Sequence, residues 1–316
     1  MKKLALIFLL AFSEAVLGQS FPSKPVRIIV AFPPGGGTDI VARLLGERLS
    51  RTWSQPVVVE NRAGASGTIG TELAAKSEPD GYTLFMATMG NATANQHLYR
   101  MSIDPLTAFA PITKVVDVHF VFMANPSLPA KNVAELIELA RKQPGEIAYS
   151  SSGPGGAPHL AMELFKRKAG VDLRHIPYKG SAPSLTDLMG GRVMLTMDSL
   201  LQSLPNIKSG RIKALAVLSP HRVALLPDVP TVGETLPGYA LTNWFGLLAP
   251  AATPKPVLAK IYADASQVLK DAEFQKKVAE QGADVVGNTP EEFGAAMRAE
   301  SAQWAEIIKA AGIKAE

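Results

Sequence analysis

Cysteine is absent from the 316 residues of this chain, and charged residues make up only 19% of it. The missing thiols exclude disulfide bonds, thiolate nucleophiles and cysteine-based metal sites. The low charge and the 47% hydrophobic content exclude a disordered chain. The net charge of +4 comes from scattered lysine and arginine without a basic stripe and interleaved aromatics, so we expect no nucleic acid partner.

Catalytic signatures are also missing. The chain has no G-x-S-x-G elbow and no H-E-x-x-H motif, and its five histidines lie apart from one another in the sequence. We therefore expect no catalytic residues, no metal and no cofactor. A Ser-His-Asp triad assembled from distant positions stays open as an alternative, because sequence spacing does not reveal it.

The N-terminus has the features of an export signal. A basic pair, Lys2-Lys3, precedes an apolar run from Leu4 to Phe12, and the small residue Gly18 follows. The run is too short to span a bilayer, so we predict a signal peptide at 1–18 and a periplasmic protein. No later segment has 18 uninterrupted apolar residues.

Beyond this signal, strand-like and helix-like patterns alternate. In the first part, apolar strand-like runs cover residues 26–31, 57–59 and 82–87, and helical spacing covers 40–49 and 67–76. Such alternation predicts a parallel sheet with helices on both faces. The pattern repeats from about residue 120 to 218, and the C-terminus is helical over 257–269, 273–281 and 290–311. The sequence thus predicts two α/β units.

The order of these segments suggests how the units are connected. We expect the chain to leave the first unit near residue 115, build the second, and return near residue 243, with the terminal helices completing the first unit. The predicted division is a signal peptide at 1–18, domain 1 from 19–118 and 243–316, and domain 2 from 119–242.

Two glycine-rich turns are the strongest functional feature. One runs from Pro33 to Asp39 and the other from Ser150 to His159, and each follows a strand-like run and opens a helix-like run. Backbone N–H groups at the start of a helix are free, and the helix dipole makes that end positive. Both turns therefore predict anion sites. One turn alone reads equally well as a tight connection with a capped helix.

Further polar residues follow predicted strands at positions where open α/β sheets bind ligands. Thr88 and Asn91 follow the third strand, and Asp198 ends a later one. Asn91 and Asp198 each have an alternative role in capping the helix that comes next. His159 stands in the first turn of a helix, where a structural hydrogen bond is the competing interpretation.

Nucleotide binding is disfavoured. The loop Gly64 to Gly70 resembles a phosphate loop but lacks its lysine, and the glycine spacing after Ala31 does not match a dinucleotide fingerprint, although Glu60 ends the following strand.

Several longer strings resemble one known family. They are Phe32 to Asp39, Val58 to Gly67, Pro79 to Leu84, Phe109 to Thr113, Ser151 to Leu160, Pro177 to Gly180, Pro227 to Thr231 with Glu234, and Trp244 to Gly246. Together they are similar to the Bug family, the periplasmic solute-binding proteins of tripartite tricarboxylate transporters. The similarity covers nearly all of the chain after the signal.

This resemblance implies an α/β, two-lobed periplasmic binding protein fold of type II, with two domains joined by hinge strands and closing over a cleft. It implies that the two glycine-rich turns hold a ligand carboxylate and that more variable positions read the rest of the ligand. Those include Met89, Asn243 and Trp244. The full set of expected ligand contacts is Phe32, Gly36, Gly37, Thr38, Asp39, Thr88, Asn91, Ser151, Ser152, Gly156, Ala157, His159, Tyr178 and Asp198.

The expected function is capture of a small carboxylate, aromatic or dicarboxylic, by a monomeric protein. The expected protein partners are the membrane permease subunits of a tripartite tricarboxylate transporter. Two alternatives stay open: a periplasmic hydrolase or isomerase acting on a small carboxylate, and a subunit that presents its ligand to a sensor kinase.

Overall fold

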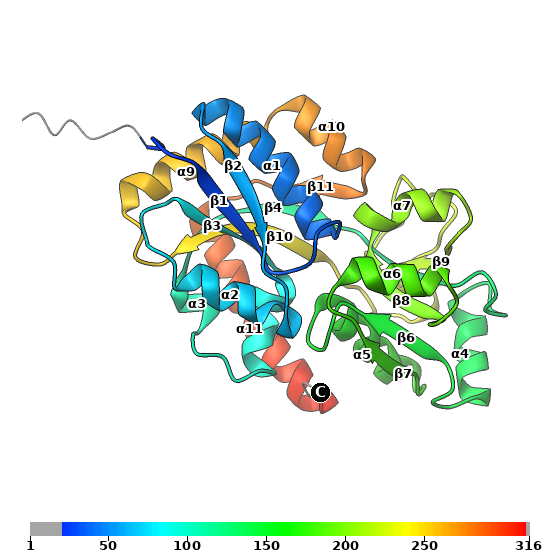
Figure 1. The fold of residues 1–316 in the computed structure, drawn as a ribbon. Coiled ribbons are helices and arrows are strands. Elements are labelled where there is room, and N and C mark those ends of the chain that lie inside the picture. The colour runs from blue at the N-terminus through cyan, green and yellow to red at the C-terminus, as the bar shows by residue number, and fades with distance from the viewer. Residues whose placement is uncertain (1–20, 314–316) are drawn as a thin grey trace, which may run out of the picture.

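Two separate β-sheets form the centre of the molecule. The computed structural model describes residues 21–313, so the predicted signal peptide at 1–18 lies outside the described residues. The first sheet has the strand order β11-β4-β10-β3-β1-β2 and the second the order β7-β6-β8-β5-β9. Figure 1 shows them in two neighbouring lobes.

The strands of the first sheet are β1 (Val26–Val30), β2 (Val57–Asn61), β3 (Thr83–Thr88), β4 (Phe109–Val118), β10 (Asn243–Pro250) and β11 (Ala283–Val285). The strands of the second are β5 (Phe120–Ala124), β6 (Ala148–Ser151), β7 (Arg174–Pro177), β8 (Leu195–Ser199) and β9 (Lys213–Val217). The α-helices are α1 (Gly37–Trp53), α2 (Thr68–Ala75), α3 (Pro105–Ala108), α4 (Val133–Lys142), α5 (Ala157–Ala169), α6 (Ser181–Met189), α7 (Leu200–Lys208), α8 (Val232–Thr235), α9 (Lys255–Leu269), α10 (Ala272–Glu280) and α11 (Pro290–Ala311).

The sequence predicted most of these elements because their hydrophobic period is regular. Helix α1 buries Val41, Leu45, Leu49 and Trp53 on one face, as helical spacing requires. Helix α11 spans Pro290–Ala311, as predicted, and begins with proline and with a capping box between Thr289 and Glu292. None of the helices within residues 21–313 combines the length and apolar character needed to cross a membrane.

The expectation of parallel sheets is wrong in part. Strand β10 runs antiparallel to both β3 and β4, and β5 runs antiparallel to β8 and β9. The reason is the connection between the lobes. Strand β4 is followed after His119 by β5 in the other sheet, and β10 returns beside β4, so the outgoing and returning strands run in opposite directions.

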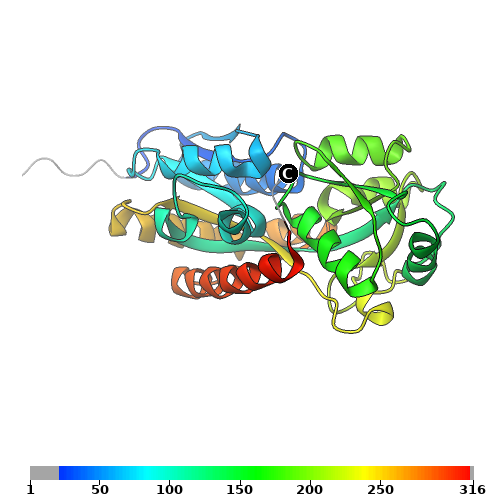
Figure 2. The same ribbon diagram turned by 90° about the horizontal axis from the view of Figure 1, so that it is seen from below.

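The long helix α11 runs under the first lobe and ends near the junction with the second, which Figure 2 shows from below. It packs against β4 and also contacts α5 of the second lobe. The C-terminal helices therefore complete the first lobe and reach the boundary between the two.

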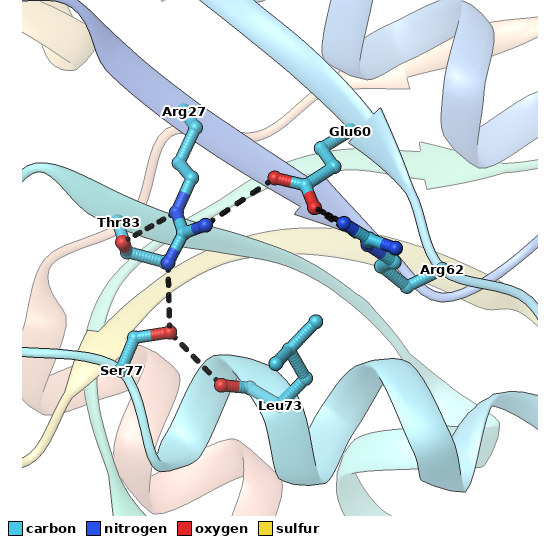
Figure 3. A network of polar contacts seen from close by, with 6 residues as sticks. All are labelled: Arg27, Glu60, Arg62, Leu73, Ser77 and Thr83. Carbon is cyan, nitrogen blue, oxygen red and sulfur yellow. Dashed lines mark hydrogen bonds and ion pairs between the residues drawn. The ribbon is translucent and has the colours of Figure 1, made fainter.

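Near the edge of the first sheet, Glu60 belongs to a surface network of polar contacts (Figure 3). Its carboxylate pairs with Arg62 and with Arg27, whose Nε donates to Thr83 Oγ1 at 2.8 Å. Arg27 also reaches Ser77, which donates to the Leu73 carbonyl. Two arginines therefore hold the Glu60 carboxylate at the edge of the first sheet.

Candidate functional site: a cavity between the two lobes

Both glycine-rich turns lie at the start of a helix, as predicted. Gly36 is the N-cap of α1, and Gly156 is the N-cap of α5; neither cap position supplies a side-chain hydrogen bond. The first N–H groups of these helices therefore depend on partners from outside the helix. The two turns belong to different lobes, one following β1 and the other following β6.

A small cavity of about 40 Å³ lies between the lobes. From the first lobe it is lined by Phe32, Pro33, Gly36, Gly37, Thr38, Thr88, Asn243 and Phe245, and from the second by Phe120, Ser152, Ala157, Pro158, Ser181, Asp198, Ser199 and Gln202. The lining draws on the N-terminal ends of four helices: α1, α5, α6 and α7. These ends carry partial positive charge, so the cavity favours an anion.

Asp198 is the only ionisable residue among those that line this cavity. No lysine or arginine faces it in the described part of the chain, so an anion bound here would rely on backbone N–H groups and hydroxyls. Asp198 is 2% exposed. Burial raises its pKa to about 6, although the Ser181 side chain, the Ser199 N–H group and Gln202 act in the opposite direction.

A hydrogen bond joins the two lobes at the cavity. The N–H group of Gly37, at the start of α1, donates to the side-chain oxygen of Gln202 on α7 at 2.5 Å. Gln202 therefore caps a helix of the opposite lobe with its amide oxygen. The side chains of Ser199 and Leu201 also lie within 3.3 Å of the position that a Cβ at Gly37 would take, so the approach is close.

Other interlobe contacts surround the cavity. The hydroxyl of Tyr99 in the first lobe donates to the Pro154 carbonyl in the second at 2.6 Å. Gly155 and Gly180 both have positive φ, and a Cβ at either would meet Asn95 Oδ1 at 2.8 Å or Pro33 Cδ at 2.6 Å. Glycine at these positions therefore permits both the backbone conformation and the contact between lobes.

Two buried polar atoms near the cavity, Asn243 Oδ1 and Asn91 Nδ2, have no hydrogen-bond partner among residues 21–313. Buried polar groups are normally paired. Asn243 belongs to the cavity lining, where the Ser181 hydroxyl and the Gln202 amide act on the Asp198 carboxylate as hydrogen-bond donors.

Asp39 stabilises the first turn and does not line the cavity. Its carboxylate accepts hydrogen bonds from the Gly35 N–H group at 3.0 Å and from Asn61 Nδ2 at 2.9 Å, and it pairs with Arg43. Burial would raise its pKa, but these three partners outweigh burial and hold the pKa below its usual value.

Ser151 and His159 stabilise the second glycine-rich turn in the same way, without lining the cavity. Ser151 Oγ accepts from the Gly153 N–H group and lies 2.7 Å from His175 Nε2. His159 Nδ1 accepts from the Gly155 N–H group at 3.0 Å, and its ring stacks on His175. Burial, followed by His175, lowers the pKa of His159 to about 4, so the ring is neutral at pH 7.

Asn91 and Tyr178 point their polar groups elsewhere. Asn91 lies in a π-helical turn, Gly90–Ala94, and its Oδ1 accepts from the Thr88 N–H group at 2.8 Å. The Tyr178 hydroxyl donates to Asp187 at 2.6 Å, and burial together with that carboxylate raises its pKa to about 12. Both residues support elements next to the cavity without lining it.

The cavity thus brings together eight of the expected contacts: Phe32, Gly36, Gly37, Thr38, Thr88, Ser152, Ala157 and Asp198. It does not include Asp39, Asn91, Ser151, Gly156, His159 and Tyr178. The lining residues outside the expected set are Pro33, Phe120, Pro158, Ser181, Ser199, Gln202, Asn243 and Phe245.

Some of the lining residues outside the expected set were indicated by the sequence. Ser181 follows β7 and Ser199 is the last residue of β8, at the ends of strands where open sheets bind ligands. Asn243 was indicated by the family resemblance. Gln202 lies inside a helix and has no local signal, because its role depends on contact with the opposite lobe.

Comparison with known proteins agrees with this architecture. The family model described as "Tripartite tricarboxylate transporter family receptor" matches residues 41–313. The chain is 36% identical over 303 residues to Protein BugT of Bordetella pertussis, covering 95% of this chain and 93% of that protein.

Two solved structures are similar throughout. "R. palustris Rpa4515 with adipate" shares 39% identity at a TM-score of 0.91, covering 93% of this chain and 99% of that one. "MatC (Rpa3494) from Rhodopseudomonas palustris with bound malate" shares 29% identity at a TM-score of 0.87, covering 91% and 100%.

Proposed function

Because the chain belongs to the tripartite tricarboxylate transporter receptor family, we propose that it captures a small carboxylate in the cavity between its lobes and delivers it to the membrane subunits of such a transporter. It acts as a monomer in the periplasm and catalyses no reaction. The lobes that close on the ligand are domain 1 (19–118 and 243–316) and domain 2 (119–242).

The observation that carries this proposal is the convergence of helix N-termini from both lobes on one cavity without a lysine or arginine. Each charge–dipole contact is worth about 0.3–2 kcal/mol. Each charge-assisted hydrogen bond adds about 1.5–3 kcal/mol. Micromolar affinity needs only about 8 kcal/mol in total. A handful of N–H and hydroxyl donors is therefore enough to hold a carboxylate.

The bound ligands of the relatives support the chemical class. Adipate and malate, which the two similar structures contain, are both small carboxylates. In this chain, Gly36 and Thr38 would supply donors from one lobe, and Ser152 and Ala157 from the other. Asp39, Ser151 and His159 would hold the two turns in shape, as their internal hydrogen bonds suggest.

The same arrangement explains how binding is signalled. A carboxylate contacts donors of both lobes only when the lobes are together, so the ligand stabilises the closed form over the open one. The membrane subunits would then recognise the closed form.

The decisive experiment compares acids with their uncharged amides. We expect a thermal-shift screen of mono-, di- and tricarboxylates to find ligands that raise the melting temperature, because binding to the folded state stabilises it. Calorimetry should then show at least tenfold weaker binding of the matching amide. Equal affinity of acid and amide would refute the proposal.

A matched pair of variants locates the site. Thr38→Val, which removes a hydroxyl that lines the cavity, should weaken carboxylate binding several-fold. Thr52→Val, on the exposed side of the same helix, should leave it unchanged. Mass spectrometry of the ligand after incubation separates a carrier from a hydrolase or isomerase, because a carrier returns its ligand intact.

A further inference from the structure

Asp198 places a carboxyl group inside the cavity that is proposed to receive a second one from the ligand. Its side chain is 2% exposed, and it is the only ionisable residue of the lining. The cavity has a volume of about 40 Å³, so a ligand carboxylate inside it would come close to the Asp198 carboxylate. Among the described residues no lysine or arginine lines the cavity to neutralise the two charges.

Neutral donors surround Asp198 in place of a cation. The Ser199 N–H group donates to Asp198 Oδ1 at 2.7 Å, and the Ser181 hydroxyl and the Gln202 amide also act on the carboxylate as donors. These bonds favour the ionised form, yet burial outweighs them and raises the pKa of Asp198 to about 6. Burial thus brings the proton equilibrium close to neutrality, and the charge of a ligand acts in the same direction.

The elements around Asp198 do not place another charge in the cavity. Strand β8, which carries Asp198, packs against β5, β6, α5, α6 and α7. Their titratable groups are Tyr149 on β6, His159, Glu163 and the basic run 166–168 on α5, Asp187 on α6 and Lys208 on α7, while β5 has none. None of these groups lines the cavity. Across the cavity, Asp39 of α1 is paired with Arg43 and does not line it either.

Coulomb repulsion gives the size of the effect. Two unit charges about 6 Å apart, at an effective dielectric constant of about 20, shift a proton equilibrium by about 100-fold. A bound carboxylate therefore favours the neutral form of Asp198, which does not repel the ligand and gains an O–H group that can donate a hydrogen bond. The ligand stays ionised, because helix N-termini and N–H groups stabilise its charge.

We propose that this protein binds a carboxylate together with one proton, which passes from solvent to the Asp198 carboxylate as the ligand enters the cavity. The affinity is then highest at low pH and falls as the pH rises and Asp198 retains its charge. This inference rests on the proposed function, since the ligand is the carboxylate captured between the lobes.

The test measures affinity and proton uptake by calorimetry with the full chain. The probes are malate, succinate and adipate, together with the tightest acid of the carboxylate screen, and they are almost fully ionised between about pH 6.5 and pH 8.5. We expect about 20-fold weaker binding at pH 8.5 than at pH 6.5. Titrations at pH 7 in phosphate and in Tris, whose ionisation enthalpies differ, should show uptake of about 0.8 proton per ligand.

Asp198→Asn resembles the neutral carboxyl group in shape and cannot take up a proton. We expect its affinity to be constant across this pH range, without proton uptake, and to exceed that of the wild type about 20-fold at pH 8.5. Asp228→Asn removes an exposed carboxylate of the same lobe and should reproduce the wild-type profile. A pH dependence that persists in Asp198→Asn would assign the proton to another group and overturn the inference.

Infrared difference spectroscopy of the wild type keeps the test independent of any variant. Binding of a ligand with ¹³C-labelled carboxyl groups at pH 7 should produce the carbonyl band of a protonated carboxyl group at its unlabelled position. A histidine cannot produce this band. A band that shifts with the label would place the proton on the ligand, and the absence of any band would show that Asp198 stays ionised; either result refutes the inference.

The outcomes separate this inference from the proposed function. If the acids bind with equal affinity at both pH values and without proton uptake, the proton linkage is refuted and carboxylate capture stands. If neither these acids nor the wider screen gives a ligand, both proposals fall.

Discussion

At the scale of single residues, some polar groups of the site line the cavity, and others stabilise the turns that form it. Asp198 is buried and lines the cavity, whereas the carboxylate of Asp39 lies outside it and is held by Gly35, Asn61 and Arg43. The sequence marked both as site residues, since both stand beside a predicted strand or helix end. Only the direction of each side chain, set by its neighbours, distinguishes their roles.

The raised pKa of Asp198 predicts how the stability of the folded protein depends on pH. Its carboxyl has a pKa of about 6 in the folded protein, against 3.8 for an unperturbed aspartate. The folded state therefore holds this proton more tightly, and the stabilisation present below pH 4 is lost as the pH rises from 4 to 6. The loss amounts to roughly 3 kcal/mol.

Asp198→Asn cannot ionise and should escape this loss. We expect the free energy of unfolding of the variant, relative to wild type, to rise by roughly 3 kcal/mol between pH 4 and pH 7, measured by urea denaturation without ligand. A difference that is flat across this range would show that Asp198 is not a buried, destabilising charge.

Asp39 should behave in the opposite way. Asp39→Asn removes charge-assisted hydrogen bonds to Gly35 and Arg43, so we expect the variant to be about 1–3 kcal/mol less stable at pH 7. Because the folded-state pKa of Asp39 is lowered, this difference should shrink as the pH falls below 3.8. Glu47→Gln, at an exposed pair on the same helix, is the control and should cost less than 1 kcal/mol. Equal effects of both variants would contradict this account.

At the scale of elements, the functional unit is the strand–turn–helix. The turns after β1 and β6, the turn before α6 and the end of β8 each lead into a helix whose N-terminus lies at the same cavity. The hydrophobic period of each strand and helix predicted these elements, and the carboxyl-end rule for open sheets predicted which ends would carry the site. Neither rule predicted that β4, β5 and β10 take part in antiparallel pairs, because strand direction depends on how the chain crosses between the sheets.

The start of α1 offers a test of the close approach between elements. A methyl group at Gly37 would lie 3.1 Å from Ser199 Oγ and 3.3 Å from Leu201, both in the opposite lobe. We expect Gly37→Ala to weaken carboxylate binding about 5- to 30-fold, an overpacking cost of about 1–2 kcal/mol. The melting temperature without ligand should not fall, since alanine suits a helix better than glycine.

Gly190→Ala is the matched control for that variant. Its added methyl group meets only the carbonyls of Thr186 and Asp187 within its own lobe. It should therefore leave the affinity unchanged. If both variants reduce affinity alike, the contact between α1 and the second lobe is not what closure requires.

At the scale of the whole molecule, two lobes meet around a cavity and are joined by strands that leave and return through the same region. The Tyr99 hydroxyl and the Pro154 carbonyl, which lies in the second glycine-rich turn, form one bond across this boundary. Such a bond exists only while the lobes are together, so it contributes to closure and hence to affinity.

Tyr99→Phe removes this bond together with the contact of the same hydroxyl with Ser66 Oγ at 3.0 Å in the first lobe. We expect about 2- to 10-fold weaker ligand binding, corresponding to about 0.5–1.5 kcal/mol for one hydrogen bond. Small-angle scattering with subsaturating ligand should show a larger radius of gyration than for wild type. Tyr262→Phe, on α9 of the first lobe, is the control. An unchanged affinity for Tyr99→Phe would show that this contact does not stabilise the closed form.

The sequence by itself determined the local structure and the kind of chemistry. Hydrophobic period and turn residues specify most strands and helices, because these depend on neighbours in the chain. Glycine-rich turns ahead of helices specify anion sites for the same reason. What only the tertiary structure decided is which of these ends face one another. Gln202 reaches Gly37 from 165 positions away, and Asp198 rather than Asp39 lines the cavity. Such contacts follow from the packing of two lobes, which no local pattern encodes.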